Sequence, residues 1–206
     1  MPLVPEVRLF LAEDAIILWA RLEATAGRSL PAPYWASAWT GGQALARYIL
    51  DHPAAVAGRT VLDIASGSGL VAIAAAMAGA RAVTANDVDP YAIAAISANA
   101  RANGVVIRPA TRDLLDGDGD GAEVVLAGDA LYDGLMARRV MPFLIRAADR
   151  GAHVLLGDPG RQHLPADRLR PLATYHAAIT GPPEDAQIRR ADVFAVRATT
   201  DTLQQR

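Results

Sequence analysis

The 206-residue sequence contains no cysteine and no lysine. Without cysteine the chain forms no disulfide, no thiolate metal site and no thiol nucleophile, which fits a reducing cytoplasm. All 20 basic residues are arginine, so the lysine of a P-loop is excluded. We attribute the arginine-only, alanine-rich composition to genome base composition, and we expect a cytoplasmic bacterial protein.

Long runs of one charge or of apolar residues are also absent. The net charge is −2 and no arginine run exceeds two residues, so we expect no nucleic-acid partner. The longest apolar run, Leu70–Ala80, is shorter than the roughly 20 residues of a membrane-spanning helix. Acidic residues at 6, 13 and 14 argue against a secretory or transit peptide. The four histidines are dispersed, and we predict no metal site.

The apolar pattern predicts helices and strands that alternate along most of the chain. The expected helices are 5–27, 39–50, 69–79, 90–103, 133–150 and 165–172. The expected strands are 60–65, 81–86, 105–110, 123–127, 153–157, 173–179 and 191–199, the last two joined by Gly181-Pro182-Pro183.

Such alternation predicts an α/β fold. We expect a doubly wound, mainly parallel, Rossmann-like seven-strand sheet with an antiparallel C-terminal strand and an N-terminal helical extension. Residues 1–206 would form one domain, with 1–55 as a helical cap and 56–206 as the sheet core.

A glycine loop follows the first predicted strand, in the segment VLDIASGSGL from Val61 to Leu70, and Asp87 ends the next strand. In a βαβ unit this pattern favours a nucleoside, because glycine admits the ligand to the backbone and the acid accepts ribose hydroxyls. Asp63 and Ala65 disfavour a pyrophosphate, since an acid would repel it and the dinucleotide fingerprint has glycine where this chain has Ala65. S-adenosylmethionine, with its ammonium and sulfonium, complements these acids. The alternative is a tight turn in which Asp87 caps the helix at Pro90.

Two further acids follow predicted strands and should meet the glycine loop at the same edge of the sheet. Asp113 follows the third strand and would receive the adenine amino group; alternatively it caps a turn. Asp129 follows the fourth strand, together with Tyr132, beside the expected methyl donor. The alternative there is a helix N-cap and a buried tyrosine.

Three of the few aromatic residues, Tyr34, Trp35 and Trp39, fall within six positions, although only 5% of the chain is aromatic. They would close the pocket over a cofactor or stack on a substrate cation, or else anchor the N-terminal helices on the sheet. Trp39 adjoins Gly41-Gly42 and is the better cofactor candidate, whereas Tyr34 and Trp35 are candidates for substrate binding.

Seven segments together resemble a known family: PYWA from Pro33, WTGGQALARY from Trp39, the loop from Val61, NDVDP from Asn86, NARANG from Asn99, GDALYD from Gly128 and GDPGR from Gly157. With them the chain resembles class I, seven-strand methyltransferases dependent on S-adenosylmethionine. Within this class it is most similar to the lysine methyltransferases of the electron transfer flavoprotein beta subunit.

The resemblance implies a role for each candidate residue. The glycine-loop residues would hold the methionine part of S-adenosylmethionine: Asp63, Ser66, Gly67 and Gly69. Asp87 would bind the ribose, Asp113 the adenine, and Asp129 and Tyr132 the lysine of the flavoprotein. Rival interpretations are a methyltransferase for another protein, such as ribosomal protein L11, one for a small molecule, or a non-catalytic S-adenosylmethionine-binding protein.

Overall fold

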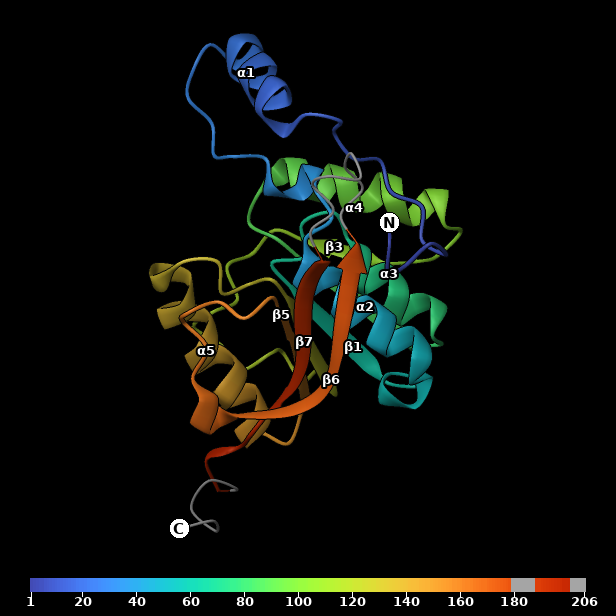
Figure 1. Ribbon diagram of the computed structural model, residues 1–206, viewed down its shortest axis with the longest axis vertical. Coiled ribbons are helices and arrows are strands. Elements are labelled where there is room, and N and C mark those ends of the chain that lie inside the picture. Colours follow the sequence, from blue (N-terminus) through green and yellow to red (C-terminus); the bar gives the residue numbers. More distant parts are fainter. Residues whose placement is uncertain (179–187, 201–206) are drawn as a thin grey trace.

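The computed structural model describes residues 1–178 and 188–200 (Figure 1). Its strands form one sheet of order β3-β2-β1-β4-β5-β7-β6. They are β1 (Thr60–Ile64), β2 (Ala82–Asn86), β3 (Arg108–Ala110), β4 (Val124–Gly128), β5 (His153–Asp158), β6 (Leu169–Ala178) and β7 (Ile188–Val196). Among the described residues the helices are α1 (Ala15–Ala26), α2 (Thr40–Asp51), α3 (Leu70–Met77), α4 (Pro90–Ala102) and α5 (Gly134–Asp149). Three 3-10 turns, η1 (Tyr34–Ala36), η2 (Pro53–Ala55) and η3 (Ala166–Arg168), lie between them.

The direction of the strands confirms the predicted fold class. β1 to β5 pair in parallel, whereas β7 runs antiparallel to both β5 and β6. β1 lies inside the sheet, with β2 on one side and β4 on the other. The chain therefore winds away from β1 in both directions, and the junction between β1 and β4 is the place where such sheets bind ligands.

Each face of the sheet is covered by helices, because the apolar side chains of the central strands alternate between two cores. On one face α5 packs on residues such as Leu62, Val125 and Leu156. On the other face α2, α3 and α4 pack on residues such as Val61 and Leu126. Figure 1 shows α5 on one side of the strands and α2 with α3 on the other. None of the described helices is long and apolar enough to cross a membrane.

The predicted helix over residues 5–27 is wrong in its first half. Residues 1–14 run without helix, because Val4 and Val7 are buried against α2 and α3. The backbone amides of Arg8 and Phe10 donate to the side chains of Asn103 and Asn99 at distances of 2.9 and 2.7 Å. Asp14 then caps α1, which has no buried residue and projects from the body (Figure 1).

Two other predictions differ from the structure. Residues 165–172 contain only η3 and the start of β6, so the predicted helix is wrong there. Pro171 lies in β6 at a register irregularity, which an edge strand tolerates because it needs fewer ladder hydrogen bonds. β3 is limited to Arg108–Ala110, shorter than the predicted 105–110. The predicted connection at Gly181-Pro182-Pro183 lies outside the described residues.

Candidate functional site

A cavity of about 990 Å³ opens at the carboxyl ends of β1, β2 and β4, beside the topological switch point. Every site residue predicted from the sequence except Gly69 lines it: Tyr34, Trp35, Trp39, Asp63, Ser66, Gly67, Asp87, Asp113, Asp129 and Tyr132. Parallel pairing brings them together, because Ile64 lies opposite both Asn86 and Ala127 in the register. The structure shows that these residues lie around one cavity, and the role of each stays a prediction.

The glycine loop turns through left-handed backbone conformations. Gly67 and Gly69 have φ of 55° and 83°, and a side chain at Gly69 would approach Ile96 within 3.3 Å. Ala65, at the position where glycine is usual, also has a left-handed φ of 48°. The methyl group is accommodated there, but the conformation is strained for an alanine.

Asp63 is the most buried acid of the cavity, with 1% of its surface exposed. Its Oδ2 accepts a hydrogen bond of 2.5 Å from the Ser66 hydroxyl, whereas its buried Oδ1 has no hydrogen-bond partner. Burial raises the pKa of Asp63 to about 7, and the Ser66 hydroxyl and the backbone amide of Ala72 partly oppose this rise. An unpaired buried carboxylate oxygen is costly, and a cationic ligand would supply the missing donor.

Asp87 lies at the end of β2 and ties the glycine loop to the next turn. Its Oδ2 accepts from the amide of Gly67 at 2.9 Å and its Oδ1 from the amide of Asp89 at 3.0 Å. Burial raises the pKa of Asp87. Each carboxylate oxygen has more than one lone pair, so Asp87 can still accept hydrogen bonds from the hydroxyl groups of a ligand. The helix cap next to it is Asp89, which accepts from the amide of Tyr91.

Asp113 caps its own turn, as the alternative interpretation predicted, and adenine binding by Asp113 stays a prediction. It lines the cavity, and it also accepts from the amide of Leu115 at 3.1 Å within its own turn. Arg139 of α5 donates to its other oxygen at 2.8 Å, and this contact lowers the pKa of the Asp113 carboxyl. Asp113 is thus a neutralised acid at the far end of the cavity.

Asp129 holds three parts of the structure together. It follows β4 with a φ of 57°, and 6% of its surface is exposed. Its Oδ2 accepts from the amides of Gly41 and Gly42, which begin α2, and its Oδ1 accepts from Arg161 Nη2 at 2.6 Å. The alternative interpretation of the sequence was that Asp129 caps the helix that follows it. Asp129 is a cap, but of α2, while Asp133 caps α5.

Glycines explain how α2 comes so close to the sheet. A Cβ at Gly41 would lie 2.5 Å from the carbonyl oxygen of Gly157 and 2.7 Å from Asp129 Oδ2. A Cβ at Gly128 would lie 2.8 Å from the Cα of Gly42. The GG and GD segments are therefore required where the amide end of α2 meets β4 and β5.

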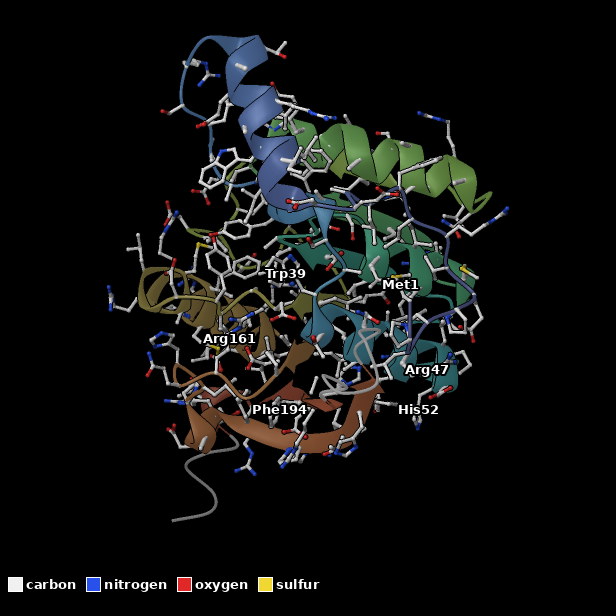
Figure 2. The ribbon with its side chains drawn as sticks, turned by 45° about the horizontal axis from the view of Figure 1, so that its top comes forward. Met1, Trp39, Arg47, His52, Arg161 and Phe194 are labelled. Carbon is white, nitrogen blue, oxygen red and sulfur yellow. The ribbon has the colours of Figure 1, made fainter. Side chains whose placement is uncertain are left out.

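The aromatic residues gather at the mouth of the cavity. The ring centroid of Tyr34 lies 5.1 Å from that of Tyr132 and 5.9 Å from that of Trp39, and all three rings are partly exposed. Trp39 donates from Nε1 to the carbonyl of Tyr34, and Trp35 stacks on Tyr91. Tyr132 is therefore not the buried tyrosine of the alternative interpretation; its pKa is raised by partial burial. Figure 2 labels Trp39 below α1.

The sequence places Asp158 after the fifth predicted strand, at the same edge of the sheet, but sequence reasoning assigned no role to Asp158, Arg161 or Tyr91. Arg161 lines the cavity and pairs with Asp129, and Asp158 at the end of β5 is fully buried beside it. The signal was present in the GDPGR segment, which was recognised only as a family motif. In Figure 2 Arg161 and Trp39 both lie between α1 and the β6–β7 strands in that view.

Comparisons with known proteins agree with this architecture. The family model described as "Ribosomal protein L11 methyltransferase (PrmA)" matches residues 44–128. A Xenopus laevis "Electron transfer flavoprotein beta subunit lysine methyltransferase" is 39% identical over 186 residues, covering 84% of this chain and 72% of that protein. The Danio rerio protein of the same name is 39% identical over 170 residues, covering 82% of this chain and 65% of that protein. The chain thus spans less than two thirds of the length of the Danio rerio relative.

A solved structure of similar fold is a ribosomal protein L11 methylase from Lactobacillus delbrueckii subsp. bulgaricus. Its TM-score is 0.56 at 22% identity, and the match covers 78% of this chain and 81% of that one. The expectation of a bacterial cytoplasmic protein is contradicted, because the relatives that match most of the chain come from vertebrates and Caenorhabditis elegans. Arginine and alanine usage follows base composition in any genome, so it does not identify the source.

Proposed function

We propose that this chain, which belongs to the family of electron transfer flavoprotein beta subunit lysine methyltransferases, transfers methyl groups from S-adenosylmethionine to lysine side chains of that subunit. The observation that carries the proposal is 39% identity to the Xenopus laevis protein across 72% of its length. We further propose that residues 1–206 act as one domain, in which 1–55 cap the sheet core of 56–206.

The buried acids support S-adenosylmethionine as the methyl donor. Asp63 Oδ1 is a buried acceptor without a partner, and the ammonium of the methionine part is a donor that fits it. Two of the three described arginines that line the cavity, Arg139 and Arg161, already pair with Asp113 and Asp129 and are not free to bind a phosphate; the third is Arg28. S-adenosylmethionine supplies an activated methyl group bonded to a cationic sulfur. Asp63 and the glycine loop would bind its methionine part and Asp87 its ribose.

The mouth of the cavity supports a protein acceptor. The exposed rings of Tyr34, Trp39 and Tyr132 offer faces on which a lysine ammonium gains cation–π attraction. Ile16 and Ile17 on α1 are more than half exposed, and the segment after α1 lines the cavity. Exposed apolar residues beside a binding site are typical of surfaces that contact a macromolecule.

A second candidate acceptor is ribosomal protein L11, favoured by the family model that matches residues 44–128. That match covers mainly α2 to β4, which is the part of the chain that surrounds the methyl donor. The part that would distinguish acceptors lies at the cavity mouth, including Tyr34 and Arg161, outside the matched residues. A likeness in the donor half says little about the acceptor.

The test is incubation with methyl-labelled S-adenosylmethionine and either purified electron transfer flavoprotein, purified L11, or a lysate. We expect label on the beta subunit, at lysine by mass spectrometry. An Asp63→Asn variant serves as the control that retains the acceptor surface. Label on L11 or on a small molecule, with none on the flavoprotein, would refute the proposed acceptor. Absence of any transfer and of any donor binding would refute the methyltransferase itself.

A further inference from the structure

Arg161 is the cation that contacts Asp129. Its Nη2 donates to Asp129 Oδ1 at 2.6 Å and its Nε at 3.3 Å. Oδ2 of the same carboxylate is taken by the amides of Gly41 and Gly42. Both oxygens of this buried acid therefore have protein donors, and the acid is neutralised by a guanidinium that keeps its charge at any working pH.

Asp158 fixes the loop from which Arg161 reaches the cavity. The fully buried Asp158 accepts at Oδ1 from the amides of Gly160 and Arg161, at 2.8 and 2.7 Å. Its Oδ2 has no hydrogen-bond partner and lies 3.9 Å from Arg161 Nε. Backbone and side chain of Arg161 are thus held by two different acids, so the position of the guanidinium is defined.

A saturated Asp129 is unsuited to binding the lysine ammonium and to accepting its proton. A free carboxylate beside a lysine amine would favour the ammonium form and raise the pKa of that amine. The ammonium has no lone pair, so it cannot attack a methyl group. With Arg161 on Oδ1 and α2 on Oδ2, Asp129 offers the amine little net negative charge. The guanidinium itself disfavours a second cation nearby.

We propose that Arg161 is a positioning residue that neutralises Asp129 and keeps the acceptor lysine in its uncharged form; this inference rests on the proposed lysine methylation. The lysine ammonium first loses a proton to water. The nitrogen lone pair then forms the bond to the methyl carbon as the carbon–sulfur bond breaks, and its electron pair passes to sulfur. The products are a methylated ammonium, which carries the positive charge that sulfur has lost, and S-adenosylhomocysteine.

Several other charged or titratable groups face this end of the cavity or lie against the Arg161 loop. They are Arg28 after α1, Tyr34 of η1, Asp63 of β1, Asp87 and Asp89 after β2, Tyr91 of α4, Asp129, Tyr132 and Asp133 after β4, Asp158 of β5, His163 beside Gly134, and Arg138, Arg139 and Asp113 near α5. Tyr132 keeps its proton at working pH, because its pKa is raised. Arg139 is bound to Asp113. Arg28 also lines the cavity, but Arg161 is the arginine that contacts Asp129.

The test is the pH dependence of the single-turnover methylation rate with saturating flavoprotein and S-adenosylmethionine. In the native protein the rate should rise with pH, and the apparent pKa of this rise should lie below the value of about 10.4 for free lysine. Arg161→Gln should raise that pKa by about one to two units and slow turnover at pH 8 about 10- to 100-fold, with recovery near pH 10. Arg161→Lys keeps the charge and should stay within about half a unit of the native pKa. Affinity for S-adenosylhomocysteine checks that each variant is folded.

Three outcomes would overturn the role of Arg161 alone. One is an Arg161→Gln rate lowered equally at every pH, which indicates a purely structural contact. Another is a faster Arg161→Gln variant with a lower KM, which indicates that the substrate displaces Arg161. The third needs no variant: a native pKa at or above that of free lysine. A native protein that methylates no lysine at any pH would instead overturn the proposed function, and this inference with it.

Discussion

Asp63 makes the binding of S-adenosylmethionine depend on pH near neutrality. Burial raises its pKa to about 7, so a ligand cation finds the carboxylate ionised in roughly a tenth of molecules at pH 6 and nine tenths at pH 8. The apparent Kd equals the intrinsic Kd divided by the competent fraction, and it should therefore rise about tenfold from pH 8 to pH 6. Binding at pH 6 should also release close to one proton.

Titration calorimetry with S-adenosylhomocysteine, which has the same ammonium, measures both quantities when it is repeated in buffers of different ionisation enthalpy. Asp63→Asn is the matched control, since it removes one ionisation and retains Asp87 and the ligand amine. The Kd of this variant should not change tenfold between pH 8 and pH 6. At pH 8 the variant should bind S-adenosylhomocysteine more weakly than the native protein. A native Kd that varies no more than the variant's between pH 6 and pH 8 would refute the reasoning.

The same burial affects stability with a defined sign. Because the pKa is raised from 3.8 to about 7, the folded protein holds the proton more tightly than the unfolded chain. The stability that this provides is present below about pH 4 and is lost as the pH rises through about 7, for a total of about 4 kcal/mol. Asp63→Asn should therefore exceed the native protein in unfolding free energy at pH 8, with a smaller difference at pH 5. Urea unfolding at both pH values measures this change.

Four further substitutions and one control, Gly42→Ala, test the site. Gly41→Ala should lower the unfolding free energy by about 3 kcal/mol, measured by thermal or urea unfolding, because the added Cβ would overlap Gly157. In the control Gly42→Ala the added Cβ meets no atom closer than 3.9 Å, so the unfolding free energy should barely change. Ala65→Gly should raise stability by about 1 kcal/mol in the same assay, because it relieves a φ of 48°; no gain would exclude strain there. Asp129→Ala should abolish methyl transfer, because it leaves Arg161 unpaired and the amide end of α2 uncapped, and it should lower stability by about 2–4 kcal/mol while calorimetric cofactor affinity stays within a few-fold; retained turnover would contradict this dependence. Asp87→Ala should weaken calorimetric binding of S-adenosylmethionine at least about tenfold, and unchanged affinity would remove its predicted ribose contact.

Much of the fold could be predicted because local patterns and tertiary packing agree in the sheet core. The helix from Pro90 and the strand before the glycine loop lie within a residue or two of their predicted bounds. The prediction for the N-terminal segment was wrong, because its apolar residues pack against α2 and α3 rather than form one side of a helix. Its extended path depends on Asn99 and Asn103, which are about 90 residues away in sequence. No local pattern carries that information.

The sequence by itself determined the alternation of strands and helices in the sheet core, the glycine loop, and the acids that follow the strands. These features depend on the spacing of apolar residues and on the residue types at single positions, which are local properties of the chain. The tertiary structure alone decided which of those acids are free. In the folded protein Asp63 is buried with one carboxylate oxygen unpaired. Asp113 forms an ion pair with Arg139, and Asp129 pairs with Arg161 and accepts hydrogen bonds from the amides of α2. Charge pairing depends on distances across the fold, and these arise only when the carboxyl ends of separate strands meet at one edge of the sheet.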